Sequence, residues 1–306
     1  MTSQTWVQRV TTLNQWRRGG ERAPHKPLLL LYALGRLQQT GSSSMSFADA
    51  EANLRRLLEE FGPPRTTSPG YPFHHLTTDG LWMVRTPSGP GSPGPNLGRL
   101  RAGATGELAR DFAQAVERDP RLFAFVVRAI LDTNFPSTLH EDILDATGIS
   151  LGTAELSEAP VLATMPRRRD PAFRERVLVA YEYRCAVCGY DGQLQREAVG
   201  LDAAHIRWWA ADGPDEIANA IAACSFHHKL LDRGAIGLTV DHKLTVSSHF
   251  LGRSAMAETL VLSVIERPLL APQLGQPLPH DQHIAWHAAQ VFRAPARLAP
   301  GAPGAP

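Results

Sequence analysis

The side chains best suited to chemistry lie between positions 185 and 232, where they form two interleaved sets. One set contains all three cysteines of the chain and one histidine: Cys185, Cys188, Cys224 and His227. The other contains two histidines and an asparagine: His205, Asn219 and His228. Thiolates and imidazoles bind transition metals, and imidazoles also transfer protons near neutral pH. The spacing within each set indicates a different role.

The first set has the spacing of a zinc knuckle. Two residues separate Cys185 from Cys188, and two separate Cys224 from His227. Two such pairs supply the four ligands of a tetrahedral Zn²⁺ site and leave no position for water. The spacing therefore predicts a structural zinc; the alternative is that these are buried free cysteines. Three cysteines cannot all pair, and this spacing suits a metal better than a disulfide, so we expect a reduced, cytoplasmic protein.

The second set suits hydrolysis of a phosphodiester. That reaction needs an activated water, a cation that neutralises the phosphate, and a group that holds the base in position. A histidine on a strand, an asparagine in a loop and a histidine on a helix can supply these when zinc ties the strand end to the helix start. Adjacent helical residues point in different directions, so one of His227 and His228 can face zinc and the other an active site. The alternative is that these histidines pack or face solvent.

In this region the chain resembles the HNH, or ββα-metal, endonuclease family. The matching segments are 202–206, 213–220 and 224–234. The resemblance implies that His205 is the general base that polarises water and that His228 is a ligand of a catalytic Mg²⁺ or Mn²⁺ ion. It also implies that Asn219 fixes the geometry of the loop and the base.

The carboxylate that completes the catalytic metal site has two candidates. Asp232 lies one helical turn beyond His228, so both side chains face the same side of the helix. Many relatives carry an acidic residue or a histidine directly before the general base, whereas this chain has Ala204 there. The nearest upstream acid is Asp202. Either aspartate could be the second ligand.

The surrounding sequence predicts an α+β protein with a mainly helical N-terminal half. Apolar residues at three- and four-residue intervals predict helices over 12–16, 26–38, 46–61, 106–117 and 120–132. A short strand is expected over 81–84, and the Gly/Pro-rich run 88–95 suits neither a helix nor a strand interior, so it predicts a surface loop.

In the C-terminal half, Asp170 and Pro171 suit the N-cap and first position of a helix over 171–181. The segments 237–240 and 243–246 predict a hairpin, and 285–292 predicts a closing helix. We expect an N-terminal domain over 1–152, a linker over 153–169, a zinc-containing nuclease domain over 170–294 and a disordered tail over 295–306.

Composition limits the classes of partner. A net charge of +1 gives little bulk attraction to nucleic acid, so DNA binding would depend on local basic patches. No apolar run approaches the roughly 20 residues that span a bilayer, so no membrane association is expected.

The N-terminal half resembles the sulfur-binding domain that recognises phosphorothioated DNA. The segments that carry the likeness are 22–31, 71–76 and 134–144. Together with the HNH region, this architecture is similar to the McrA-like, phosphorothioate-dependent type IV restriction endonucleases. Sulfur is larger and less strongly hydrated than the phosphate oxygen it replaces. A shallow pocket of aromatic and proline atoms would therefore favour it, because burying an oxygen there leaves its hydration unreplaced.

The resemblance implies roles for several residues of this half. Tyr71 and Pro72 would form the pocket wall, with His25 and Lys26 beside it to hold the charge of the modified phosphate. The remaining candidates would line the pocket or reach phosphates and bases: His74, His75, Arg99 and Arg101. The alternatives are a packing turn at Tyr71–Pro72 and solvated surface charge at the basic residues.

These observations favour a modification-dependent endonuclease that binds phosphorothioated double-stranded DNA and cuts nearby phosphodiesters. Two alternatives stay open. The first is an HNH nuclease that reads another mark, such as a methylated base, and the second is a non-catalytic, zinc-stabilised DNA-binding module. Cutting both strands with one site per chain requires two protomers or two successive nicks, so a homodimer is a further expectation.

Overall fold

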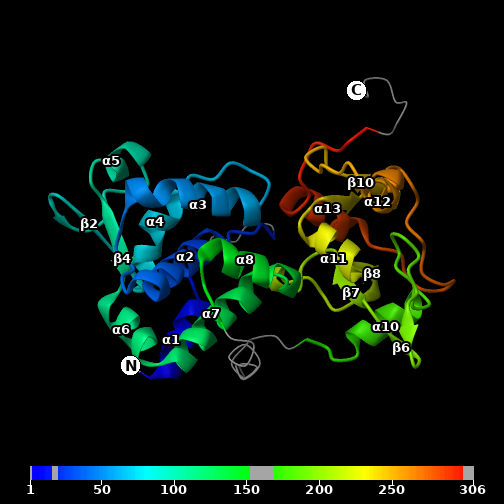
Figure 1. The fold of residues 1–306 in the computed structure, drawn as a ribbon, viewed down its shortest axis with the longest axis horizontal. Helices are drawn as coiled ribbons and strands as arrows, with labels where there is room; N and C mark the ends of the chain where they lie inside the picture. Colours follow the sequence, from blue (N-terminus) through cyan, green and yellow to red (C-terminus); the bar gives the residue numbers. More distant parts are fainter. Residues whose placement is uncertain (1, 16–19, 152–168, 299–306) are drawn as a thin grey trace. The chain divides into compact units, whose positions relative to one another are not determined.

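The computed structural model describes residues 2–15, 20–151 and 169–298. The chain divides into two compact units, Met1–Arg167 and Arg168–Pro306 (Figure 1). The N-terminal unit is mainly helical and the C-terminal unit mixes helices with hairpins, which confirms the predicted α+β class. No helix in the described part of the chain combines the length and apolar character that a bilayer crossing requires.

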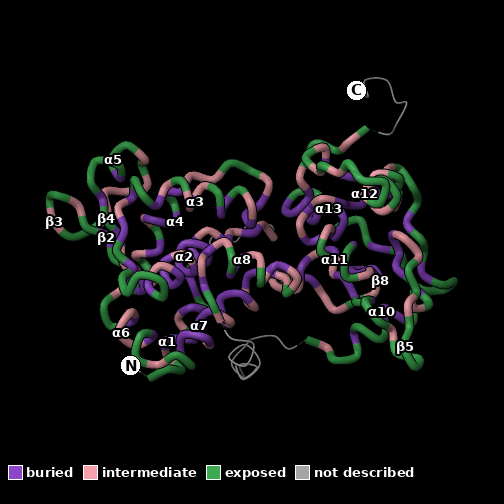
Figure 2. The backbone as a smooth tube through the Cα atoms, viewed as in Figure 1, coloured by how far each residue is buried: buried purple, intermediate pink, exposed green. Residues whose placement is uncertain are grey.

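The N-terminal unit is built around helix α2 (His25–Thr40). Residues Leu28 to Leu31 have no exposed surface, and the first turns of α2 are buried (Figure 2), whereas Gln38 to Thr40 at its end are exposed. A helical segment whose side chains are apolar on every face is buried in the protein core. Its neighbours are α3 (Phe47–Phe61), α4 (Gly70–His75), α7 (Pro120–Asn134) and α8 (His140–Thr147). The start of α2 is thereby fixed beside α4.

A small antiparallel sheet lies at one edge of this unit. Its strand order is β1 (Met45–Ser46), β4 (Thr105–Leu108), β2 (Trp82–Thr86) and β3 (Gly89–Pro90). The remaining elements are α1 (Ser3–Thr11), which packs on α7, α5 (Leu97–Arg101), α6 (Arg110–Arg118), and the 3-10 turns η1 (Leu76–Asp79) and η2 (Ser137–Leu139).

The C-terminal unit contains a hairpin followed directly by a helix, the ββα arrangement. Strand β7 (Leu201–His205) pairs antiparallel with β8 (Ala220–Cys224), and α11 (Ser225–Asp232) follows. Helix α10 (Phe173–Ala180) and α11 both pack on this hairpin, whose alanines are almost all buried. Small side chains allow both helices to approach the strands closely.

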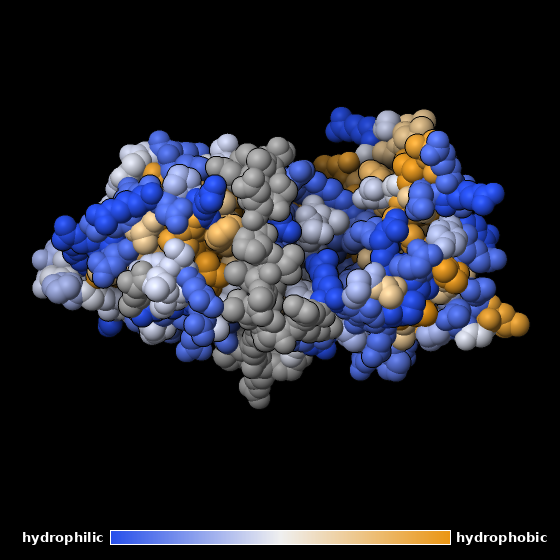
Figure 3. Space-filling model, turned by 90° about the horizontal axis from the view of Figure 1, so that it is seen from below, coloured by the Kyte–Doolittle hydropathy of each residue, from blue (hydrophilic) through white to orange (hydrophobic). Residues whose placement is uncertain are grey.

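The remaining C-terminal elements complete the core of this unit. Strands β9 (Ile236–Leu238) and β10 (Leu244–Val246) form a second hairpin, on which α13 (Asp281–Gln290) packs. Shorter elements are β5 (Gln193–Leu194), β6 (Glu197–Ala198), α12 (Ala255–Leu260), η3 (Trp209–Ala211), η4 (Ile217–Asn219) and η5 (Leu262–Val264). The face shown in Figure 3 is largely hydrophilic, with apolar patches between polar side chains.

Several local predictions differ from the structure. The helix expected over 106–117 begins only at Arg110, because 105–108 form β4. Gly106 passes against the rings of Trp82 and Phe73, where an added Cβ would lie 2.2 Å from Trp82. A glycine in a strand marks such a close approach. The helix expected over 12–16 is also wrong at 12–15, since α1 ends at Thr11; position 16 lies outside the described residues.

Three further segments differ from the sequence-based predictions. Helix α10 begins two residues later than expected: Ala172 is its N-cap, and Asp170 accepts from the Ala172 amide at 2.9 Å instead. Within the run predicted as a loop, Gly89–Pro90 pair with β2. Within the segment predicted as a disordered tail, Ala296 pairs with Ser247, and Arg297 donates to Val246 O at 2.7 Å. Residues 299–306, and the predicted linker up to residue 168, lie outside the described residues.

Candidate functional site

The three cysteines and His227 meet at one point of the C-terminal unit. Cys185 and Cys188 lie in the turns after α10, Cys224 ends β8, and His227 lies in the first turn of α11. Their ligand atoms all lie within 4.8 Å of one another. His227 Nδ1 is 3.1 Å from Cys224 Sγ and 3.7 Å from Cys185 Sγ. In the described part of the chain, this is the one group of three or more such ligands gathered so closely.

The hydrogen bonds of His227 suit a metal ligand. Its Nε2 donates to Leu260 O at 2.9 Å, which leaves Nδ1 facing the sulfurs. A backbone acceptor on the outer nitrogen fixes the tautomer of metal-binding histidines in this way. Burial works to lower the pKa of His227, but hydrogen bonds from its ring to Cys185 and Cys224 outweigh burial and raise the pKa to about 10. Hydrogen bonds with Cys188 and Cys224 lower the pKa of Cys185 and so favour its thiolate. The donor set fits one tetrahedral cation.

His205 lies at the end of β7, where two side chains contact its ring. Its ring stacks on Phe173 of α10, with centroids 4.4 Å apart. Its Nε2 lies 2.8 Å from Asp215 Oδ1, and the two side chains are only 14% and 11% exposed. Nδ1 makes no hydrogen bond within the described part of the chain. The second ring nitrogen is therefore the one available to a reactant.

Asn219 is fully buried and holds the loop between β7 and β8. Its Oδ1 accepts from the Arg207 amide at 2.9 Å. Its Nδ2 donates to Arg207 O at 3.0 Å and to Pro214 O at 2.9 Å. The amide thus spans the two ends of the loop that carries Asp215, and its contacts go to backbone rather than to His205 or His228. This geometry suits a loop-holding role.

His228 is not part of the cysteine cluster and lies beside both candidate carboxylates. Its Nε2 lies 3.3 Å from Asp232 Oδ2, and its Nδ1 lies 3.7 Å from Asp202 Oδ2. The Asp232 side chain is 2% exposed, whereas that of Asp202 is 52% exposed. Arg174 Nε lies 3.5 Å from Asp202 Oδ1. The three candidate ligands, His228, Asp202 and Asp232, are adjacent but not as closely gathered as the cysteine cluster.

A cavity of about 640 Å³ opens at the start of α2 in the N-terminal unit. It is lined by Asn14, Gln15, Ala23, His25, Lys26, Thr66, Thr67, Tyr71, Pro72, His75 and Thr78. The structure therefore brings together five of the eight residues predicted for DNA binding. Tyr71 is half exposed and stacks on His75, with centroids 5.9 Å apart and planes 11° apart.

The charges around this cavity are largely compensated. Lys26 Nζ lies 2.6 Å from Asp79 Oδ2 and donates to Asn14 O at 2.7 Å, and both charged side chains are buried. Burial, followed by repulsion from Arg65 and Arg22, lowers the pKa of His25 to about 4, so its ring is neutral at pH 7. The His25 Nε2 atom is buried without a hydrogen-bond partner.

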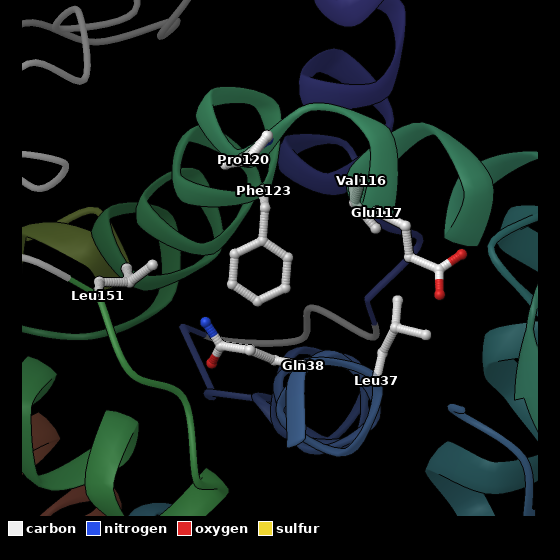
Figure 4. A pocket seen from close by; sticks show the side chains of 7 residues that line it. All are labelled: Leu37, Gln38, Val116, Glu117, Pro120, Phe123 and Leu151. Carbon is white, nitrogen blue, oxygen red and sulfur yellow. The ribbon is translucent and has the colours of Figure 1, made fainter. Parts of the chain in front are cut away.

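The other three predicted residues lie outside the cavity lining. His74 Nδ1 lies 2.8 Å from Ser92 Oγ. Arg101 forms a two-point contact with Glu51, at 2.7 and 2.5 Å. Arg99 is exposed on α5. A second cavity of about 390 Å³, between α2, α6 and α7, contains none of the predicted residues (Figure 4).

Two carboxylates that the structure places against predicted residues were not among the residues predicted from the sequence. Asp79 pairs with Lys26 across 53 positions, and Asp215 pairs with His205 across ten. No motif marked Asp79. Asp215 falls inside the segment that carries the HNH likeness, but its spacing to His205 has no helical or strand period that would predict contact.

Comparison with known proteins supports both predicted resemblances. Residues 3–151 match the family model of the ScoMcrA-like DNA sulfur-binding domain, and residues 185–239 match that of an HNH endonuclease. No curated protein matches the chain.

Solved structures similar to this chain include the sulfur-binding domain of SprMcrA complexed with phosphorothioated DNA. The two sequences are 26% identical and the TM-score is 0.42, and the match covers 49% of this chain and 95% of the SprMcrA domain. They also include the sulfur-binding domain of ScoMcrA complexed with phosphorothioated DNA, at 23% identity and a TM-score of 0.40, covering 49% and 97%. The type IV phosphorothioation-dependent restriction endonuclease ScoMcrA matches at 21% identity and a TM-score of 0.37, covering 46% and 32%.

The cysteine cluster leads to a prediction on metal content. We expect one Zn²⁺ per purified chain, and we expect Cys188→Ser to remove it, because a site with three ligands loses most of its affinity. Since binding free energy at such sites is also folding free energy, the variant should lower the melting temperature of the C-terminal unit. Elemental analysis and thermal melts with and without chelator measure both effects. Ser225→Ala is the matched control, and a wild-type protein that carries no metal and melts identically in chelator would contradict the prediction.

The buried ion pair beneath the N-terminal cavity leads to a second prediction. Asp79→Ala leaves the Lys26 ammonium buried without its counter-ion, which should lower the free energy of unfolding by about 3–5 kcal/mol. Adding Lys26→Met in the same chain should restore most of the loss. Chemical denaturation of the full chain measures both, with the exposed Glu59→Ala as control. A loss below about 1 kcal/mol, the range of a surface pair, would show that the pair is not buried in solution.

Proposed function

We propose that this chain, which joins a ScoMcrA-like DNA sulfur-binding domain to an HNH endonuclease domain, is a modification-dependent DNA endonuclease. It binds phosphorothioated double-stranded DNA through the N-terminal unit and hydrolyses phosphodiesters near the modification through the C-terminal unit. The observation that carries the proposal is the pairing of a sulfur-reading domain with a histidine whose Nδ1 is available for proton transfer.

The N-terminal cavity is suited to sulfur rather than to plain phosphate. Its walls include the ring of Tyr71 and the ring of Pro72, which offer no replacement for the hydration of a phosphate oxygen. His25 is neutral, and Asp79 offsets the charge of Lys26, so electrostatic attraction to every phosphate is reduced. A weakly hydrated sulfur loses less on entering such a cavity, and this difference is the basis of discrimination.

In the nuclease unit, His205 takes a proton from the attacking water at Nδ1. Asn219 holds the β7–β8 loop, which carries Asp215, the hydrogen-bond partner of His205. His228 and one of the two carboxylates beside it would hold Mg²⁺ or Mn²⁺, which would neutralise charge on the phosphate.

The two carboxylates beside His228, Asp202 and Asp232, differ in solvent exposure, and this difference indicates a different role for each. A cation that contacts DNA must remain accessible, and Asp202 is half exposed on the His228 Nδ1 side. Asp232 is buried against Nε2, where a carboxylate orients a ligand and raises its basicity. We therefore assign cation binding to His228 Nδ1 and Asp202, and orientation of the ring to Asp232. A homodimer would supply the second site needed to cut both strands together.

The first test separates binding from cutting. His205→Ala should abolish cutting of a duplex with one phosphorothioate, because the proton acceptor is lost, while its affinity for that duplex stays within about twofold of wild type. Cleavage gels and binding by fluorescence anisotropy measure the two properties on the same DNA. Undiminished cutting by this variant would contradict the assignment of His205.

The second test concerns sulfur reading. Tyr71→Ala removes a half-exposed wall, so the fold should be unchanged while affinity for the phosphorothioated duplex falls about tenfold, consistent with loss of one aromatic contact worth roughly 1–3 kcal/mol. Competition with unmodified and methylated duplexes of the same sequence provides the control. If the methylated duplex competes as well as the phosphorothioated one, the domain reads a different mark.

A further inference from the structure

The general-base candidate His205 has a carboxylate partner that no motif assigned. Asp215 Oδ1 accepts from His205 Nε2 at 2.8 Å, and both side chains are mostly buried. The ring of Phe173 stacks on the imidazole of His205. The hydrogen bond to Asp215 and this stacking together restrict rotation of the imidazole. A histidine held in this way has one ring nitrogen committed to the protein and one free for a reactant.

Asp215 is itself held firmly. Its Oδ2 accepts from the Asp170 amide at 2.8 Å, and its backbone carbonyl accepts from Arg176 Nη2 at 3.0 Å. The adjacent Pro214 O accepts from Asn219 Nδ2. The Asp170 amide therefore holds the carboxylate, while Arg176 of α10 and the buried Asn219 hold the backbone that carries it. Asp215 is therefore held in one position by several hydrogen bonds, whereas an ion pair on the surface is usually held by its partner alone.

We propose that Asp215 is a positioning residue for the hydrolytic reaction, which keeps the His205 proton on Nε2 so that Nδ1 accepts the proton of the attacking water. The inference rests on the proposed nuclease function. When a water proton moves to Nδ1 and the water oxygen bonds to phosphorus, the ring becomes positively charged and faces the Asp215 carboxylate. The phosphorus–oxygen bond to the leaving strand breaks, that oxygen takes a proton from solvent, and His205 later returns its proton to solvent.

The two contacts of the carboxylate make replacement by asparagine informative. An asparagine has one oxygen and one NH₂ group, but Asp215 accepts hydrogen bonds at both oxygens. The Asp170 amide can only donate, so the asparagine oxygen must turn toward it and the NH₂ group then faces His205 Nε2. Nε2 must accept, and the ring proton moves to Nδ1, the atom that should be vacant. Alanine leaves the ring free to adopt either tautomer.

The kinetic test compares these variants on a phosphorothioated duplex. Asp215→Asn should lower kcat roughly 100-fold or more, the range in which a wrong histidine tautomer disables a proton acceptor. Asp215→Ala should lose less, and KM and DNA affinity should stay near wild type for both. In a His205→Ala background, Asp215→Asn should cause no further loss, because the two residues act as a unit. The neighbouring Glu216→Gln, an exposed carboxylate, is the matched control.

A purely structural role for Asp215 would give a different pattern. Equal kcat for Asp215→Asn and wild type, or a loss that adds fully to that of His205→Ala, would overturn the proposal.

A second measurement keeps the inference separate from the proposed function. Long-range ¹H–¹⁵N correlation spectra of the His205 ring should show the proton on Nε2 in the wild type and on Nδ1 in Asp215→Asn, whether or not any DNA is cut. A wild-type ring protonated on Nδ1 would overturn the proposal, whereas a correct tautomer in a protein that cuts no DNA would count against the nuclease function alone.

Discussion

The cost of burying a polar group without a partner is the constraint on which both units depend. An unpaired buried polar group costs about 1–3 kcal/mol, and an unpaired charge costs more. Asn219 avoids this cost with three backbone hydrogen bonds, which also close the β7–β8 loop. Lys26 avoids it through Asp79. Asn219 and Lys26 are therefore each held in position by the same contacts that allow their burial.

In the C-terminal unit this constraint separates two neighbouring histidines. His227 donates to Leu260 O and turns Nδ1 to three sulfurs, while His228 lies between two carboxylates. Consecutive helical residues cannot share a direction, so α11 contributes one side chain to each site. The cysteine cluster joins the turns after α10, the end of β8 and the start of α11. A metal bound there would fix the hairpin that carries His205 against the helix that carries His228.

Residues of the candidate site could be predicted from the sequence where they lie a few positions apart in the chain. Two-residue gaps between Cys185 and Cys188, and between Cys224 and His227, predicted the cluster that the structure gathers. Local spacing could not predict the carboxylates that pair with Lys26 and His205, because Asp79 and Asp215 reach them only through tertiary packing. The strand at 105–108 was missed for a related reason, since its apolar spacing suited a helix and its partner β2 is distant in sequence. Periodicity reports which face of an element is buried, but not what covers it.

We propose that one chain both recognises sulfur in DNA and cuts that DNA. The most direct test of this proposal is cleavage of a single duplex made with and without one phosphorothioate at a defined phosphate, in Mg²⁺ or Mn²⁺, with cuts mapped on both strands. We expect cuts only in the duplex that contains sulfur, at phosphodiesters some distance from the modified phosphate. Equal cutting of both duplexes would contradict it.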